Sequence, residues 1–272
     1  MTVSHRRLRT VARAATLFAA SLLLAPGAIA QAFDAVRLYG VAPGTDGGLA
    51  GLALIAGTQY AGSDERRTLL VPLLDYQWRN GWFAGTGNGV GFNFASRPDQ
   101  QYGLRITGDF GRKARRSTVL TGMGDIGAKA EFGGFFNYAL THEVFISSSL
   151  RYGAGDRSNG LVVDLGAGYS TSLAPQWRLG VGGAVSLINA GYGQSYFGVT
   201  PAQAISSGHA QYTPGAGLRD ARANLALTHQ INARTAVTAV LSSSTLLGDA
   251  KNSPLVRQQT TVNGVLGLTY GF

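Results

Sequence analysis

Apolar and polar side chains alternate along most of this sequence, and the alternation is clearest in residues 259–272. One face of that segment includes Leu266 and Phe272, whereas the other includes Asn263 and Thr269. Successive side chains of a β-strand point to opposite faces, so a period of two residues predicts an amphipathic strand. The same pattern recurs in 101–110, 125–138 and 161–173.

The predicted strands are long enough to cross a bilayer. They run to roughly 9–15 residues, which matches outer-membrane barrels rather than the mode of about 5–6 in globular sheets. The twelve segments are 35–42, 48–60, 66–78, 82–95, 100–110, 125–138, 142–154, 160–173, 177–189, 215–229, 233–246 and 259–272. An open sheet edge in hydrocarbon would leave backbone groups without hydrogen bonds. We therefore predict an all-β fold, a closed antiparallel transmembrane β-barrel of about 12 strands, with 10 or 14 as alternatives.

The connections predict which end of the barrel faces which compartment. Both termini of a bacterial barrel normally lie in the periplasm, and extracellular loops are longer than periplasmic turns. This rule assigns to the periplasm the turns 61–65, 96–99, 139–141, 174–176 and 230–232. It assigns to the outside the long connections 111–124, 190–214 and 247–258. Aromatic girdles are then expected at both interfaces, with Tyr60 and Tyr270 near the periplasm and Trp78 and Trp82 near the outer surface.

Residues 1–30 have the pattern of a secretory signal. A basic start through Arg13 precedes an apolar stretch from Ala14 to Ala25, and small residues precede a cleavage site after Ala30. The apolar stretch is shorter than the roughly 20 residues of a membrane-spanning helix, which disfavours a membrane anchor. We therefore predict export to the outer membrane, with residues 31–272 forming one barrel domain.

Composition narrows the function classes. The 272 residues include 39 glycines, no cysteine and only 14% charged residues, which disfavours a helical bundle and excludes stabilising disulfides. The formal charge of +9 falls to +5 without the four arginines of the predicted signal, since 19 basic residues then accompany 14 acidic ones. That mild excess does not indicate nucleic-acid binding.

Charged residues fall on the face that the alternation assigns to the lumen. They are Arg105, Asp109, Lys129, Glu131, Arg151, Asp164, Arg178, Asp220 and Arg222. A charge on the lipid face near the midplane would cost roughly 2–4 kcal/mol, so this placement supports the assignment of faces. The charges could line a polar pore or ligand site, or could neutralise one another in a plug, which the small barrel favours. Arg105 with Asp109 and Lys129 with Glu131 are candidate pairs.

No group of residues indicates catalysis. His142, His209 and His229 have no serine or acid at an informative spacing, and the sequence has no H-E-x-x-H motif or metal-ligand cluster. We therefore expect no catalytic, cofactor-binding or metal site and no enzymatic activity.

Two further patterns have structural as well as functional interpretations. The alternate glycines from Gly85 to Gly91 lack the spacing of a phosphate-binding loop and do not open a helix. They leave one face of segment 82–95 bare, with room for a bulky lumen group or for curvature. The basic segment 111–116 could bind lipopolysaccharide phosphates at the outer rim or could be a solvated loop.

Short motifs in order along the chain resemble the MipA/OmpV family of outer-membrane proteins. They are Tyr60-Ala61-Gly62-Ser63 followed by Pro72 and Trp78, Gly122-Met123-Gly124-Asp125, Tyr196-Phe197-Gly198-Val199 with Gln203-Ala204 and Ser207-Gly208, Leu246-Leu247-Gly248-Asp249-Ala250, Ser253-Pro254-Leu255-Val256 and Tyr270-Gly271-Phe272. The resemblance implies an outer-membrane scaffold or adaptor for peptidoglycan-remodelling enzymes, which binds the lytic transglycosylase MltA and links it to a peptidoglycan synthase. Alternative functions are a small-solute channel and a surface adhesin or receptor that uses loop 190–214.

The predicted topology indicates where partners would bind. A peptidoglycan enzyme can reach only periplasmic turns, so we predict a docking surface at 61–65, 96–99 and 139–141. The turn residues in question are Tyr60, Gly62, Ser63, Asp64 and Glu65, for which simple turn chemistry is the alternative. Tyr270 and Phe272 are predicted to be the signal read by the barrel-assembly machinery. The other expected partners are outer-membrane lipid and lipopolysaccharide, and no nucleic acid.

Overall fold

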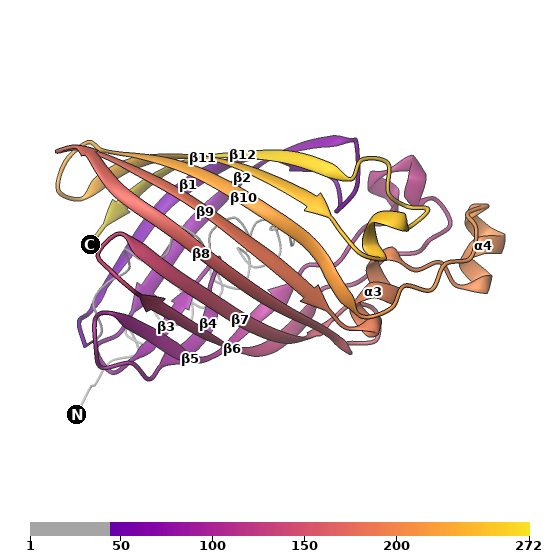
Figure 1. The fold of residues 1–272 in the computed structure, drawn as a ribbon, viewed down its shortest axis with the longest axis horizontal. Coiled ribbons are helices and arrows are strands. Elements are labelled where there is room, and N and C mark those ends of the chain that lie inside the picture. The colour runs from indigo at the N-terminus through magenta and orange to yellow at the C-terminus, as the bar shows by residue number, and fades with distance from the viewer. Residues whose placement is uncertain (1–43) are drawn as a thin grey trace, which may run out of the picture.

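The alternating segments pair into a closed barrel that runs along the long axis of the molecule (Figure 1). The computed structural model describes residues 44–272. Within them, twelve antiparallel strands follow one another around the barrel, and the last pairs with the first. The strands are β1 (Gly47–Thr58), β2 (Arg66–Gln77), β3 (Trp82–Gly85), β4 (Gly89–Asn93), β5 (Gln100–Asp109), β6 (Lys129–Ala139), β7 (Val144–Ala154), β8 (Gly160–Ala174), β9 (Trp177–Ile188), β10 (Gly217–Gln230), β11 (Thr235–Leu246) and β12 (Thr260–Gly271).

Short helices lie in the connections at one end of the barrel (Figure 1). They are α3 (Ala190–Phe197), α4 (Pro201–Ser207) and the 3-10 helices η2 (Ala114–Arg116), η3 (Thr118–Leu120) and η4 (Ala250–Asn252). No helix in the described part of the chain is long and apolar enough to span a membrane.

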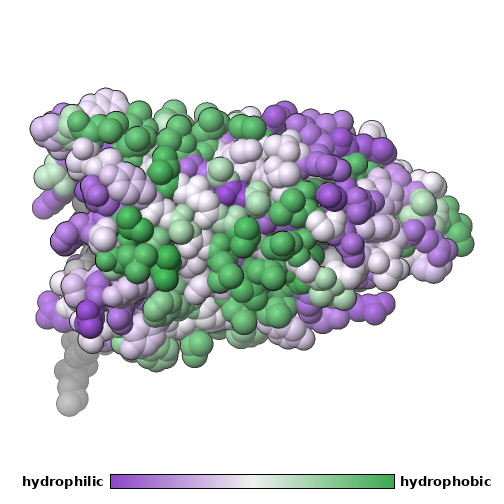
Figure 2. Space-filling view, viewed as in Figure 1, coloured by the Kyte–Doolittle hydropathy of each residue, from purple (hydrophilic) through white to green (hydrophobic). Residues whose placement is uncertain are grey.

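The outer wall of the barrel is apolar. Leu70 and Leu104 are each 62% exposed, although burying such side chains is normally favourable in water. Figure 2 shows hydrophobic side chains gathered over the middle of the wall, with hydrophilic ones toward the end that carries the helices. An apolar band on a closed barrel belongs in hydrocarbon, and the protein is an outer-membrane β-barrel.

The two faces of β12 give a direct test of this assignment. Leu266 is 52% exposed on the outer wall, whereas its neighbour Val265 faces the lumen. We expect Leu266→Arg to destabilise the barrel in bilayers by about 2–4 kcal/mol, because it places a charge in lipid. Val265→Arg is expected to cost less, because its side chain can extend into the lumen cavity. Urea titrations of both variants in lipid vesicles measure the difference, and a larger loss for Val265→Arg would contradict the assignment.

The structure has the predicted number of strands but distributes them differently. The predicted strand 35–42 and the predicted signal 1–30 lie outside the described residues. Segment 82–95, predicted as one strand, instead folds back on itself as the hairpin β3–β4, in which Trp82 pairs with Phe92. Gly89 begins β4 with φ +70°, and a Cβ atom there would lie 1.9 Å from the carbonyl oxygen of Ile106. Glycine is therefore required at this turn.

The extra hairpin reverses the predicted orientation of the first turn. Gly47 pairs with Gln77 and Leu49 pairs with Gly271, so β1 starts at the barrel end where β12 finishes. Thr58 pairs with Arg66 at the opposite end. Eleven strands follow residues 61–65, where the predicted segmentation has ten, and an odd number places the turn opposite the end of β12. The prediction that 61–65 lies on the periplasmic side with the other short turns is wrong.

The two ends of the barrel differ in their connections. We call one the loop end, which carries 59–65, 110–128, 155–159, 189–216 and 247–259. We call the other the turn end, which carries 78–81, 94–99, 140–143, 175–176 and 231–234 together with the end of β12. Short turns are periplasmic and long loops extracellular in such barrels, so the turn end faces the periplasm.

Aromatic side chains form a ladder around part of the turn end. Trp82 contacts Phe92 at a ring-centroid distance of 5.5 Å, and the series continues through Phe94, Tyr102, Phe136 and Tyr138. Such belts suit the headgroup region. Trp78 and Trp82 thus lie near the periplasmic interface and Tyr60 at the loop end, which corrects the predicted girdle positions of all three.

Candidate functional site

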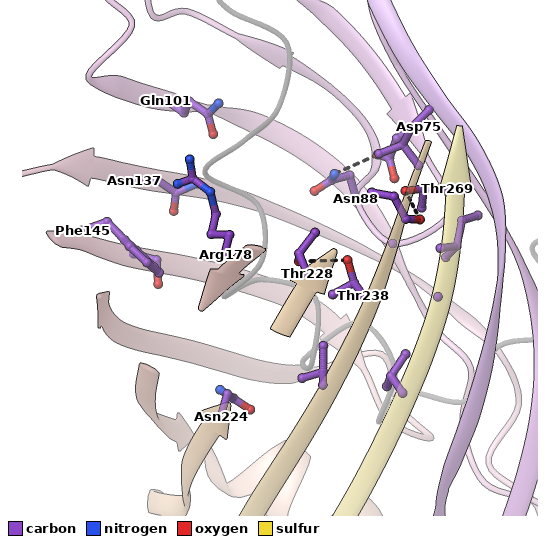
Figure 3. A pocket seen from close by; sticks show the side chains of 18 of the residues that line it. Asp75, Asn88, Gln101, Asn137, Phe145, Arg178, Asn224, Thr228, Thr238 and Thr269 are labelled. Atoms are coloured by element: carbon purple, nitrogen blue, oxygen red, sulfur yellow. Dashed lines mark hydrogen bonds between the residues drawn. The ribbon is translucent and has the colours of Figure 1, made fainter. Parts of the chain in front are cut away.

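The barrel encloses a cavity of about 1040 Å³ that reaches from the turn end into the lumen (Figure 3). Pro175 and Ala233, in two of the short turns, line its outer part. Arg105, Asp164 and Arg222 line its inner part, toward the loop end. The cavity therefore faces the periplasm.

The cavity has two chemically different walls. Strands β2, β11 and β12 contribute Val71, Leu73, Val240 and Val265, which form a buried apolar cluster with Ala53 and Ile55 of β1. Strands β5 to β10 contribute polar side chains, which include Gln101, Asn137, Arg178, Asn224 and Thr228 (Figure 3). A lumen face that is partly apolar differs from the uniformly polar interior of an open porin.

An ion-pair network, which we call the lumen network, lies at the inner limit of the cavity. Arg151 binds Glu131 at 3.1 Å and Asp164 at 2.9 Å, with all three side chains buried. Arg222 binds Asp164 at 2.7 Å and Asp220 at 3.3 Å. Each carboxylate thus has an arginine partner, which offsets the cost of removing the charges from water.

Arg219 joins this network through an irregularity in β10. The pairing of β10 with β9 shifts register between Leu218 and Asp220, so Arg219 and Asp220 are both buried inside. Arg219 binds Asp220, and also donates to the hydroxyl of Tyr192 at 3.0 Å. Strict alternation assigns Arg219 to the lipid face, and the sequence prediction omits it. The signal that could have revealed the bulge is a charge on that face.

The predicted lumen charges lie on the inner wall, but with partners other than those proposed. Glu131 accepts hydrogen bonds from Arg151 and Thr107, rather than pairing with Lys129. Asp109 accepts hydrogen bonds from the Tyr196 hydroxyl and from the backbone of Gly155. Arg105 donates to the Ser149 hydroxyl at 2.7 Å, and Arg178 points into the cavity nearer the turn end. The partners of Glu131, Asp109 and Arg105 thus come from other strands and from α3, not from nearby positions on the same strand.

Helix α3 covers the network from the loop end. Asn189 caps the helix by accepting a hydrogen bond from the backbone of Tyr192, and Tyr192 and Tyr196 stack at 4.6 Å. Burial, followed by the nearby Tyr192 and Asp109, raises the pKa of the Tyr196 phenol, so its hydroxyl keeps the proton that it donates to Asp109.

The loops around α3 form a folded structure, which we call the loop-end cap. One buried cluster joins Leu120, Met123, Val199 and Leu255, and Tyr60 packs against it and donates to the Leu255 carbonyl at 2.9 Å. A second cluster is Phe197, Leu246 and Ala250. The motifs at 60–63, 122–125, 196–199, 246–250 and 253–256 therefore meet in the loop-end cap, whereas Pro72, Trp78 and the C-terminal motif lie outside it.

The predicted docking turn belongs to this cap. Ser63 is fully buried, and Gly62 has φ +93° with a hypothetical Cβ atom 2.7 Å from Val256. Asp64 is exposed, and Glu65 donates its backbone N–H to the Ser63 hydroxyl. Glycine and serine serve the turn and its contact with the 253–256 loop, consistent with the turn-chemistry interpretation.

The basic segment 111–116 divides between the cap and the surface. Arg112 is buried and donates to the Tyr196 carbonyl at 2.8 Å. Lys113 pairs with Asp125 at 3.1 Å, and Arg115 and Arg116 are exposed. Only the two exposed arginines are thus fully available to anionic lipid.

The histidines occupy separate structural positions. His209 contacts the Val119 carbonyl at 2.7 Å, and His229 stacks on Trp177 at 4.3 Å, while His142 is exposed in a turn. Residues 44–272 contain no cluster of three or more histidine, cysteine or acidic side chains that could hold a metal ion.

Comparisons with known proteins identify one matching family. The family described as "MltA-interacting protein MipA" matches residues 50–272. No curated protein matches the sequence. The solved NanC porin is similar over 80% of this chain and 98% of its own, with 10% identity and a TM-score of 0.45. The outer membrane channel DcaP of Acinetobacter baumannii is similar over 84% of this chain and 96% of its own, with 8% identity and a TM-score of 0.41. The translocator domain of autotransporter NalP from Neisseria meningitidis is similar over 97% of this chain and 98% of its own, with 11% identity and a TM-score of 0.44.

Proposed function

The chain belongs to the MipA family, and we propose that it is a scaffold that holds a lytic transglycosylase at the periplasmic surface of the outer membrane. The family description, an MltA-interacting protein, points to an enzyme of that class. A peptidoglycan synthase would join the assembly through this enzyme. The barrel itself contributes a fixed position in the membrane next to the peptidoglycan.

The asymmetry of the barrel is the observation that supports this proposal. The loop-end cap lies at the extracellular end of the barrel, and the lumen network lies between this cap and the cavity. The turn end instead has short connections around the mouth of a cavity. A partner that acts on peptidoglycan meets the turn end, because this end faces the periplasm.

The turns at this end combine apolar and charged side chains. In 94–99, Phe94 is exposed, and Arg97 forms a two-point pair with Asp99 at 3.0 and 2.7 Å. Leu140 with Glu143 repeats the combination in the neighbouring turn, and Ile231 with Arg234 repeats it in the turn between β10 and β11. Aromatic and arginine side chains are enriched in protein interfaces, where they are bordered by polar groups. We therefore assign docking to the turns 94–99 and 140–143. The first contains the predicted turn 96–99, and the second shares residues 140 and 141 with the predicted turn 139–141.

We expect an Arg97→Ala/Glu143→Ala double variant to weaken binding of a purified lytic transglycosylase at least about tenfold. Surface plasmon resonance with the barrel in lipid nanodiscs measures the affinity. The matched control is Asp64→Ala/Glu65→Ala, which removes two charges at the loop end and should leave the affinity unchanged. Loss of binding only in the control variant, or equal affinity for all three proteins, would contradict docking by these turns.

A further inference from the structure

Three amide side chains of the cavity have hydrogen-bonding groups without a partner among residues 44–272. Gln101 and Asn137 face each other across β5 and β6 and project into the cavity (Figure 3). Asn224 lies on β10, and its Oδ1 atom is buried without a hydrogen-bond partner among the described residues. Leaving such a group unsatisfied is unfavourable, so a ligand or water that donates to it is favoured. Amides both donate and accept, which suits hydroxyl and acetamido groups.

Aromatic and aliphatic surfaces lie beside these amides. Phe83 and Phe135 line the cavity with their ring centroids 5.6 Å apart, and Phe145 lies near Asn137 on the same side of the cavity (Figure 3). The apolar cluster that includes Val71 and Val265 lines another side. A ligand that fits must therefore have apolar faces as well as polar edges, as a sugar ring does.

The charges of the cavity favour an anion. The described lining residues carry a net charge of +2. Their four arginines are Arg105, Arg178, Arg222 and Arg234, and their two aspartates are Asp75 and Asp164. Arg178 points into the cavity on the side of Gln101 and Asn137 (Figure 3). Because a cavity walled by protein focuses the field of its charges, this excess attracts a carboxylate to the site.

We propose that the lumen cavity binds a short acidic oligosaccharide, a carboxylate-bearing fragment of a few sugar rings that enters from the turn end. The volume of about 1040 Å³ accommodates such a ligand. The lumen network limits the cavity on the inner side, so the ligand enters and leaves through the periplasmic mouth. This inference deepens the proposed function, because lytic transglycosylases release carboxylate-bearing sugar fragments from peptidoglycan. The barrel would then retain a product of its partner.

Isothermal titration calorimetry of the purified barrel in detergent tests the proposal without any enzyme partner. The probes are an anhydro-disaccharide tetrapeptide, which carries carboxylates, and chitotetraose, which is uncharged. We expect saturable binding of the acidic probe, weakened at least about tenfold by Gln101→Leu/Asn137→Leu. Arg178→Gln should weaken binding of the acidic probe but leave binding of chitotetraose unchanged. Gln211→Leu, the same chemical change in an exposed loop at the other end, is the matched control and should bind normally.

Heat-modifiability on gels verifies that each variant is folded. If the double variant does not fold, Asn224→Leu on a separate strand replaces it, with the same expected loss. The proposal is overturned if the acidic probe shows no saturable binding, if chitotetraose binds as tightly, or if the cavity variants bind like Gln211→Leu. A barrel that fails to bind sugar but still captures the transglycosylase would refute this inference alone. The reverse result would refute only the proposed docking.

Discussion

Deleting Tyr270-Gly271-Phe272 is expected to prevent assembly of the barrel in the outer membrane. The backbones of Phe272 and Gly48 exchange two hydrogen bonds of 3.0 Å, and Gly271 donates to the Arg234 carbonyl at 2.7 Å. Tyr270 pairs with Ala50 of β1 and with Thr235 of β11. The deletion therefore removes the bonds that close the sheet at the turn end and leaves an open edge there. It also removes the aromatic end that the assembly machinery is predicted to read.

The measurement is the amount of heat-modifiable protein in isolated outer membranes. Phe272→Tyr is the control, because it keeps an aromatic ring near Tyr76, which stacks with Phe272 at 6.1 Å. We expect the control to assemble normally and the deletion to accumulate as unfolded protein in the periplasm. Normal levels of the folded deletion variant in the membrane would show that closure does not depend on these residues.

The period-two pattern predicted the faces of the strands better than it predicted their ends. Alternation continues through the hairpin β3–β4 and hides its turn. The sequence nevertheless contains Asn88-Gly89 between alternating apolar residues, which is the strongest short hairpin signal. Because the predicted segmentation joins 82–95 into one strand, it has one strand too few between residues 61–65 and the end of β12, and it places the first turn at the wrong end of the barrel. One local turn thus decided on which side of the membrane a proposed docking site lies.

The site residues show the limits of the same pattern. Most of the charges that follow strict alternation were predicted, but Asp75 of β2, which lines the cavity, was not among them. Arg219 was missed because a register shift turns it inward. The partners of Glu131 and Asp109 were missed because they come from β7 and from α3. Spacing along one strand carries no information about which side chain approaches from another. The roles of Tyr60 and Tyr196 in one cap likewise depend on contacts between distant loops.

Replacing Arg151 with methionine is expected to lower the free energy of unfolding by about 3–5 kcal/mol. Arg151 is the partner of both Glu131 and Asp164, and methionine would leave these buried carboxylates with fewer compensating charges. The matched control is Arg97→Met, which removes the exposed pair with Asp99 and should cost no more than about 1 kcal/mol. Urea unfolding in lipid vesicles, followed by tryptophan fluorescence, measures both values. Similar losses in the two variants would show that burial does not strengthen the network.

Conductance of the same variant in planar bilayers distinguishes a plug from the lining of a pore. If the lumen network closes the lumen, the wild-type barrel should conduct few ions, and Arg151→Met should conduct more because a link between β6 and β8 is lost. If the charges instead line a passage, the wild type should conduct already, and Arg151→Met should mainly shift its ion selectivity. The first result agrees with a scaffold whose cavity faces only the periplasm. The second would favour a channel, because a solute could then pass the network to reach the other side of the membrane.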